Sequence, residues 1–215
     1  MIVIIDYGIG NLRSVANALE KIGQDFKISS DPLVLQKAQA LILPGVGSAR
    51  EGMQNLEKLN LDKLVIEEIK DGKPTLGICL GMQLLFERSE EGKVICLGVL
   101  KGKVKKFQKE RKVPQIGWND VKIQNSKIKM QKYNSKVKNL LRDIKDLSYF
   151  YFVNSYYCEP EDKSIIVGES EYGERFASIV VKDNIVATQF HPEKSGIVGQ
   201  QLLSNIITYF NNIYH

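Results

Sequence analysis

The chain has 215 residues, of which 43% are hydrophobic and 26% are charged, and its formal net charge is +5. A chain of this length and composition can bury about 70% of its unfolded surface, which excludes a disordered or fibrous protein and makes a disulfide or metal staple unnecessary. Three dispersed cysteines, and no apolar run near the ~18 residues of a membrane span, predict a cytoplasmic protein that does not associate with membranes.

The first ninety residues alternate between apolar strands and amphipathic helices. Four short apolar runs predict strands, over residues 2–5, 26–29, 40–43 and 74–78. Apolar residues with helical spacing predict helices over residues 12–22 and 61–69, and another that continues through Phe86. The first run stops at Asp6 and lacks a basic leader, so we interpret it as a strand and not as a signal peptide.

The second half of the chain is predicted to be mainly strands. These cover residues 94–104, 118–123, 147–157, 165–169, 176–182 and 185–190. A helix over 136–144 interrupts them, and an amphipathic helix over 197–213 follows the last strand. The polar stretch 124–135 is predicted to be a loop.

Together these patterns predict an α/β fold with an open, mostly parallel central sheet, helices on both faces of the sheet, and an antiparallel-rich extension. The economical interpretation is a single domain over residues 1–215. Sheets of this kind carry their working residues in loops at the carboxyl ends of the strands, so residues that do chemistry are expected there.

Cys79 stands between two glycines in the segment Gly-Ile-Cys-Leu-Gly, after the strand 74–78 and before a helix. This is the pattern of a nucleophile elbow, in which small neighbours permit the sharp turn that exposes the central side chain. The helix N-terminus favours the thiolate form of Cys79, and the N–H group of Leu80 would point to where an oxyanion forms. A buried structural cysteine is the alternative interpretation, and the two flanking glycines argue against it.

A thiolate nucleophile needs a base, and the chain has two histidines. His215 is the last residue, where chains usually fray, which leaves His191. Glu193 lies two residues beyond His191, so an extended segment would place its carboxylate on the same face as the imidazole. Glu193 could then orient the base, as the third member of a catalytic triad does. The alternative is a core histidine with satisfied hydrogen bonds.

Two other segments with glycines follow strands. Residues 44–48, Pro-Gly-Val-Gly-Ser, could rotate a main-chain N–H group into an oxyanion hole, although such a segment can also be an ordinary turn before a helix. Gly8 and Gly10 suggest a dinucleotide-binding fingerprint, but Arg13 stands where its third glycine belongs, so we reject that interpretation. The histidines and cysteines show no ligand spacing, so neither a metal site nor a cofactor is expected.

Positive charge is concentrated in residues 101–138, where thirteen Lys or Arg residues outnumber two acidic ones. Such a segment could bind phosphates, nucleic acid or an acidic protein surface. Lys101, Lys103 and Lys105 alternate with other residues at the spacing of a strand, which favours a solvated sheet edge. Aromatic residues are too dispersed in the segment to bind bases, so no nucleic-acid partner is expected.

Three motifs resemble the class I (triad) glutamine amidotransferases in order and spacing. They are Pro-Gly-Val-Gly at 44–47, Gly-Ile-Cys-Leu-Gly-Met-Gln-Leu-Leu at 77–85 and Gln-Phe-His-Pro-Glu at 189–193. More narrowly, the chain resembles the family of glutaminase subunits of imidazole glycerol phosphate synthase, in Asp-Tyr-Gly-Ile-Gly-Asn-Leu at 6–12, Gly-Trp-Asn at 117–119 and His-Pro-Glu-Lys-Ser at 191–195. The resemblance covers essentially the whole chain and implies the flavodoxin-like fold of this class.

The resemblance implies that the chain hydrolyses L-glutamine to glutamate and ammonia through a γ-glutamyl thioester on Cys79. His191 would take the thiol proton and return it to the leaving ammonia, while Glu193 would orient the imidazole. Gly47 and Leu80 would form the oxyanion hole. The positions that match substrate-binding residues of the family are Gln83, Ser155 and Tyr156.

The resemblance also implies a partner, a (β/α)₈ cyclase with which the chain would form a heterodimer. The cyclase would join the ammonia to a phosphorylated nucleotide, and the products would be imidazole glycerol phosphate, for histidine biosynthesis, and an aminoimidazole carboxamide nucleotide. The positions that match residues at or near this interface are Asn11, Trp118, Tyr151 and Lys194.

Two positions depart from the pattern of the family. Gln115 and Asn154 stand where the family usually has histidine, near the glutamine pocket and the interface. Neither belongs to the triad, so they bear on partner choice and activation rather than on glutamine hydrolysis. Two alternatives remain: a paralogous subunit that supplies ammonia to a surface-sugar pathway, and a non-enzymatic binding module on the same fold, against which the complete triad argues.

Overall fold

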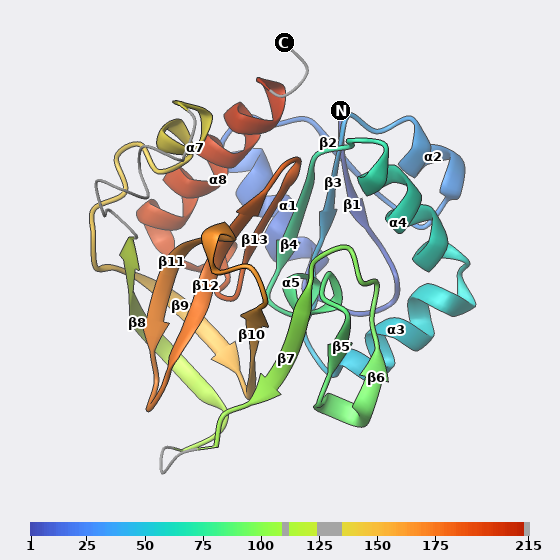
Figure 1. The fold of residues 1–215 in the computed structure, drawn as a ribbon. Helices are drawn as coiled ribbons and strands as arrows, with labels where there is room; N and C mark the ends of the chain where they lie inside the picture. Colours follow the sequence, from blue (N-terminus) through green and yellow to red (C-terminus); the bar gives the residue numbers. More distant parts are fainter. Residues whose placement is uncertain (109–111, 124–134, 213–215) are drawn as a thin grey trace.

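A computed structural model describes residues 1–108, 112–123 and 135–212 of the chain. Within these residues, thirteen strands form one continuous set of paired strands, and helices lie against it (Figure 1). The predicted loop 124–135 lies outside the described residues except for Ser135, which begins a helix.

Five neighbouring strands of the sheet are parallel. In spatial order they are β2 (Phe26–Ser29), β1 (Ile2–Ile5), β3 (Ala40–Leu43), β4 (Thr75–Ile78) and β13 (Ile185–Thr188). Every residue of β1, β3, β4 and β13 is buried. Continuous apolar runs of this kind are typical of parallel strands that are covered on both faces.

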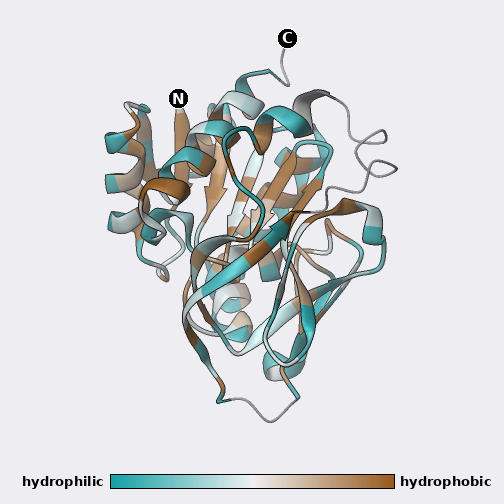
Figure 2. Cartoon of the chain, turned by 90° about the vertical axis from the view of Figure 1, so that its left-hand side faces the viewer, coloured by the Kyte–Doolittle hydropathy of each residue, from teal (hydrophilic) through white to brown (hydrophobic). Residues whose placement is uncertain are grey.

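Helices cover both faces of the parallel strands (Figure 1). In β1, Ile2 and Ile4 belong to a hydrophobic cluster with one group of helices, and Val3 and Ile5 to a second cluster with the other, because successive side chains of a strand point to opposite faces. The first group is α1 (Leu12–Lys21) and α8 (Gly196–Asn211), and the second is α2 (Pro32–Gln36), α3 (Ala49–Lys58) and α4 (Leu61–Lys70). In Figure 2 the enclosed strands are largely brown, whereas the helices around them carry both colours.

The remaining strands form the antiparallel extension, apart from one parallel pair, β5–β7. From β13 the sheet continues through β12 (Arg175–Lys182), β10 (Tyr156–Pro160), β7 (Gly102–Lys106), β5 (Arg88–Ser89) and β6 (Val94–Ile95). A branch leaves β12 through β11 (Ile166–Glu171), β8 (Gln115–Ile123) and β9 (Ser148–Asn154). The predicted fold class is therefore confirmed.

The prediction of one strand over 94–104 is wrong. The chain forms β6 and β7, and between them the N–H groups of Leu97, Gly98 and Leu100 donate to carbonyls at and just beyond the end of α5 (Leu80–Leu84). The last carbonyls of a helix lack partners within it, so this segment between the two strands caps α5.

The prediction of one strand over 147–157 is also wrong. The chain turns at Ser155, so that β9 pairs with β8 while β10 pairs with β7 and β12. An apolar run alone does not show where a chain changes neighbours. The two short helices after Ser29 and Ser48, α2 and α3, and the strand β5 were not predicted.

Both predicted helices of the second half end earlier than expected. α7 covers Ser135–Leu140 instead of 136–144, and α8 ends at Asn211, while residue 213 lies outside the described part of the chain. No helix in the described residues has the length and apolar character needed to cross a membrane. The carboxyl ends of β1, β3, β4 and β13 meet at one edge of the sheet, which brings together the loops that carry the predicted site.

Candidate active site

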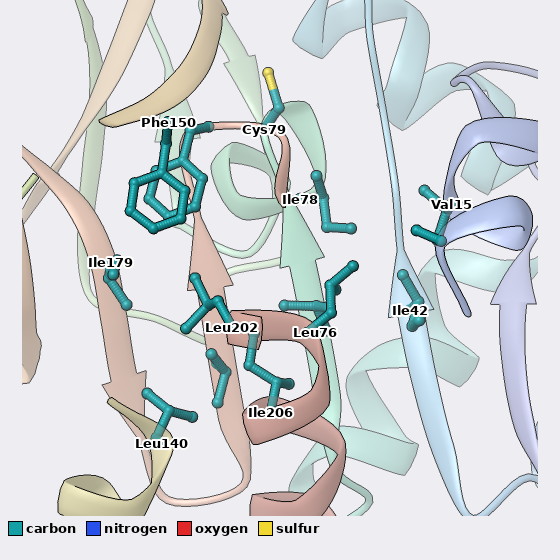
Figure 3. Close-up of a cluster of buried hydrophobic side chains, with 14 of the residues drawn as sticks. Val15, Ile42, Leu76, Ile78, Cys79, Leu140, Phe150, Ile179, Leu202 and Ile206 are labelled. Carbon is teal, nitrogen blue, oxygen red and sulfur yellow. The ribbon is translucent and has the colours of Figure 1, made fainter. Parts of the chain in front are cut away.

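Cys79 occupies a strained turn between β4 and α5. Its φ is +53°, which is unusual for a residue with a side chain, and its N–H donates to the carbonyl of Thr188 at 2.7 Å. A Cβ at Gly81 would collide with the carbonyl of Leu43, and a Cβ at Gly77 would lie 3.0 Å from the main chain of Met82. Both flanking glycines are therefore required by packing, as the elbow pattern predicts. Figure 3 shows Cys79 at the end of the strand, above a layer of buried apolar side chains.

His191 and Glu193 form a buried pair, and His191 interacts with Cys79. His191 Nδ1 lies 2.8 Å from Glu193 Oε1, and both side chains are 2% exposed. Nε2 of His191 is buried and makes no hydrogen bond in the described part of the chain. Glu193 therefore holds one ring nitrogen and leaves the other available to the nucleophile.

The charges of this group depend on one another. Burial lowers the pKa of His191, but the negative charge of the Cys79 thiolate and the interactions with Glu193 outweigh that effect and raise the pKa to about 10. His191 is therefore protonated at neutral pH whenever Cys79 carries its negative charge. The thiolate is the nucleophilic form of cysteine, so the arrangement suits attack on a carbonyl carbon.

Cys79 opens into a pocket of about 230 Å³. Seven residues that the sequence analysis singled out line it: Gly47, Cys79, Leu80, Gln83, Asn154, Ser155 and Tyr156. The pocket is smaller than the cavities that enclose drug-sized ligands, which suits a ligand the size of an amino acid. His191 and Glu193 do not line it.

The segment 44–47 passes over the pocket between two fixed points. The hydroxyl of Tyr7 donates to the carbonyl of Pro44 at 2.5 Å, and Ser48 caps α3 through the N–H of Glu51. Between them Gly47 has a φ of +111°, a region that glycine enters at little cost. Leu80 is the first residue of α5, and the first N–H groups of a helix have no partner within it. Both residues line the pocket together with Cys79, and their role in an oxyanion hole stays a prediction.

The sequence analysis did not identify three residues that contribute to the site. Gln189 is fully buried and its amide nitrogen lies 3.8 Å from Cys79 Sγ, while its amide oxygen accepts from Gln83 Nε2 at 3.2 Å. The carbonyl of Val153 accepts from Cys79 Sγ at 3.7 Å. Glu91 also lines the pocket. Only Gln189, the first residue of the motif at 189–193 that contains His191, had a signal in the sequence.

Glu91 is the only carboxylate among the described residues that line the pocket. Its Oε2 accepts from the N–H of Ala49 at 2.7 Å. Burial raises the pKa of Glu91, and the hydrogen bond from Ala49 opposes that shift. An acid in this position is suited to bind a cationic group of a ligand.

Three of the predicted interface residues lie close together. The rings of Trp118 and Tyr151 meet edge to face, with centroids 6.1 Å apart, on the outer face of the β8–β9 ribbon. Lys194 ends the turn η3 (Pro192–Lys194), which packs against β9 and against α1. Asn11 has a structural role, because its side chain caps α1 through the N–H of Ser14 at 3.1 Å. Their contact with a partner stays a prediction.

The lysines at 101, 103 and 105 are exposed to solvent to different degrees, but they do not form a sheet edge. Strand β7 is paired on both sides, with β10 and β5. Lys103 and Lys105 lie 3.7 and 3.5 Å from Glu159, and Lys101 lies 3.2 Å from Glu87. Neighbouring strands therefore offset the charge of this part of the basic segment.

The cysteines and acids show neither a disulfide nor a metal centre in the described residues. Cys79, Cys96 and Cys158 are all free and buried. No group of three His, Cys, Asp or Glu side chains there could hold a metal ion. The expectation of a site without a metal stays a prediction.

Comparison with known proteins relates the chain to one family over nearly its full length. Residues 3–208 match the family model "Glutamine amidotransferase class-I". The chain is 45% identical over 206 residues to imidazole glycerol phosphate synthase subunit HisH of Dehalococcoides mccartyi (strain CBDB1), with 95% of each chain covered. It is 46% identical over 205 residues to HisH of Aquifex aeolicus, with 94% of each covered, and 45% identical over 208 residues to HisH of Methanothermobacter thermautotrophicus, with 96% and 98% covered.

Solved structures share the fold at lower identity. A crystal structure described as a glutamine amidotransferase superposes with a TM-score of 0.75 at 17% identity, covering 98% of this chain and all of the other. A putative GMP synthase subunit from Thermoplasma acidophilum gives a TM-score of 0.68 at 21% identity, covering 98% and 94%. These similarities show the fold.

The pKa of His191 tests the coupling between the triad members. Replacing Cys79 with Ala removes the thiolate charge and leaves the burial, so we expect the pKa of His191 to fall from about 10. A histidine-selective NMR titration can follow it, because the chain has two histidines and His215→Gln removes the other signal. Cys96→Ala removes a different buried thiol and should leave the titration unchanged. An unchanged pKa in Cys79→Ala would contradict the coupling.

Proposed function

This chain belongs to the class-I glutamine amidotransferase family, and we propose that it is the glutaminase subunit of an imidazole glycerol phosphate synthase in histidine biosynthesis. The observation that carries this proposal is the buried array of Cys79, His191 and Glu193 beside a pocket of amino-acid size. The assignment to this synthase rests on the HisH relatives, which are about 45% identical to this chain over nearly its whole length. The reaction is hydrolysis of L-glutamine to glutamate and ammonia.

The first half of the reaction forms a covalent intermediate. The Cys79 thiolate attacks the γ-carbonyl carbon of glutamine, a C–S bond forms, and the carbonyl oxygen becomes an oxyanion. His191 donates its Nε2 proton to the amide nitrogen, the C–N bond breaks, and ammonia leaves a γ-glutamyl thioester on Cys79. Glu193, bound at Nδ1, keeps the imidazole oriented throughout.

Water completes the cycle. His191 takes a proton from a water molecule, which attacks the thioester carbon, and the C–S bond breaks to give glutamate and the Cys79 thiolate. The oxyanion forms twice, once in each half of the reaction. The N–H groups proposed to stabilise it are those of Leu80 and the segment ending at Gly47.

The pocket offers complementary groups for the other end of glutamine. Glu91 would pair with the α-ammonium group, since it is the only carboxylate among the described lining residues. Ser155 and Tyr156, at the turn between β9 and β10, would bind the α-carboxylate end, and Gln83 would border the side chain. Gln83 is held in place by its hydrogen bonds to the carbonyl of Tyr156 and to Gln189.

The outer face of the β8–β9 ribbon is the proposed docking surface for the cyclase, a (β/α)₈ protein in a heterodimer. Ile116, Trp118 and Tyr149 are 65%, 55% and 58% exposed there. A contiguous group of exposed apolar and aromatic side chains is typical of protein interaction sites. Such a biosynthetic complex would act in the cytoplasm.

Replacement of Cys79 with Ala should abolish glutamine hydrolysis, because no other group in the site can form the thioester. Steady-state glutamate production measures the loss, and mass spectrometry should detect no glutamyl adduct. Cys96→Ala and Cys158→Ala serve as controls and should remain active, since both thiols are buried away from the pocket. Substantial activity in Cys79→Ala would refute the nucleophile assignment.

Replacement of Glu91 with Gln should raise the KM for glutamine by about tenfold or more, because a charge-assisted pair with the α-ammonium is lost. The effect on kcat should be smaller, since Glu91 is proposed to bind the end of the substrate that does not react. Glu90→Gln is the control, because Glu90 does not line the pocket. Equal KM values in the two variants would show that Glu91 does not bind glutamine.

Docking of the cyclase is expected to complete the oxyanion hole. A missing oxyanion donor costs about 10²- to 10³-fold in turnover, so the isolated chain should be nearly inactive and the cyclase with its nucleotide should raise the rate by at least that factor. Glutaminase rates with and without partner and nucleotide measure this. Trp118→Ala and Lys194→Ala should weaken stimulation more than basal activity, whereas Leu33→Ala, an exposed apolar residue on α2, should not. Full activity of the isolated chain would refute this gating but not the triad.

A further inference from the structure

Ser195 lies between the catalytic loop and the strand that carries the docking surface. It follows η3 and precedes α8, and it is 1% exposed. Its hydroxyl donates to the carbonyl of His191 at 2.6 Å and accepts from the N–H of Tyr151 at 3.0 Å. Both hydrogen-bonding functions of this side chain are therefore used to join two segments that are distant in sequence.

Both main-chain groups of Tyr151 are directed toward the loop of His191. The N–H of His191 donates to the carbonyl of Tyr151 at 2.9 Å, and the N–H of Tyr151 reaches Ser195. In a strand, the N–H and C=O groups of one residue point to the same edge. Ser195 thus supplies the acceptor that a neighbouring strand would otherwise supply at this edge of β9.

The same edge of β9 reaches Cys79 two residues further on. Cys79 Sγ donates to the carbonyl of Val153 at 3.7 Å. Tyr151 and Val153 have the same orientation because the repeat of a strand is two residues. One strand edge therefore contacts the loop of the base through Tyr151 and the nucleophile through Val153.

The side chains of β9 link this edge to the docking surface and to the core. Tyr151 packs against Trp118 on the outer face, while Phe150 stacks on Phe190 with centroids 4.1 Å apart on the inner face. Phe190 immediately precedes His191. A partner that contacts Trp118 and Tyr151 therefore acts on a strand that is attached to the catalytic histidine by a ring stack and by two hydrogen bonds.

Ser195 has little room to move by itself. A Cβ at Gly199 would lie 2.8 Å from the Cβ of Ser195 and would collide with the carbonyl of Pro192. The first turn of α8 therefore packs closely against the loop, which favours transmission of a displacement of β9 through the Ser195 hydroxyl.

We infer that Ser195 is a positioning residue of the glutaminase, whose hydroxyl fixes the loop of His191 to β9 so that a cyclase docked on Trp118 and Tyr151 sets the position of the imidazole relative to Cys79. This inference rests on the proposed function. Ser195 does not line the pocket, so it acts through His191 and not on glutamine. A misplacement of about 1 Å in a catalytic site can cost about 10²-fold in rate.

The test compares Ser195→Ala with the unaltered chain in the complex with cyclase and nucleotide. Loss of the hydroxyl should lower the stimulated kcat by about tenfold or more, while the KM for glutamine stays within about twofold, because the pocket is untouched. Ser195→Thr retains a hydroxyl and should restore most of the stimulation. The factor of stimulation, rather than the basal rate, is the decisive quantity.

Ser170→Ala is the matched control. Ser170 is also buried, and its hydroxyl donates to the carbonyl of Asp120 at 2.6 Å and accepts from Ser178 Oγ at 2.7 Å. Its replacement removes the same number of hydrogen bonds without touching the loop of His191, so stimulation should be unchanged. If Ser195→Ala does not fold, Ser195→Cys keeps the size of the side chain with much weaker hydrogen bonding and should show the same loss.

Two results would overturn the inference. One is a Ser195→Ala variant stimulated as strongly as the unaltered chain. The other is an equal loss in Ser195→Ala and Ser170→Ala, which would indicate general destabilisation. An unaltered chain that the cyclase does not stimulate at all would instead contradict the proposed partner, and the inference would fall with it.

Discussion

The structure depends on one residue held in a backbone conformation that it would not adopt alone. Cys79 has a positive φ, which costs about 1–3 kcal/mol for a residue of this kind, and the fold maintains it from three directions. Gly77 and Gly81 lie where no Cβ fits, and the Cys79 N–H is bound by the carbonyl of Thr188 on the neighbouring strand. The sulfur is thereby placed above the sheet, at the mouth of a pocket, instead of among the core side chains below it (Figure 3).

The chemistry of the site follows from placing opposite charges together in a buried environment. Burial alone would favour a neutral imidazole, yet the thiolate and Glu193 raise the pKa of His191 to about 10. The proton is therefore held on the group that must later donate it. Glu193 Oε2 and His191 Nε2 are buried without hydrogen-bond partners among the described residues, so the stability of the triad rests on these few mutual contacts.

The antiparallel extension connects this chemistry to the protein surface. In the parallel part, β1, β3, β4 and β13 are buried on both faces and can present only their ends. The β8–β9 ribbon has an exposed face with Trp118, while the free edge of β9 contacts the loop of His191 and the sulfur of Cys79. The extension thus provides what the parallel sheet cannot, an exposed face on a ribbon whose strand β9 contacts the proposed catalytic residues.

The sequence by itself determined the parallel half of the fold and singled out the proposed triad, because both depend on local patterns. Apolar runs specified β1, β3, β4 and β13, and the glycines around Cys79 and the short spacing from His191 to Glu193 marked the chemistry. Only the tertiary structure decided that residues 94–104 are split by a segment that caps α5, and that 147–157 turns at Ser155 between two sets of neighbours. It also showed how three other residues are connected to the site. Glu91 and Val153 line the pocket, and Val153 also contacts Cys79, whereas Ser195 is bound to Tyr151 on β9. Such contacts leave no periodic or local pattern, because the hydrogen bond to Tyr151 or to Cys79 exists only after the sheet has brought distant segments together.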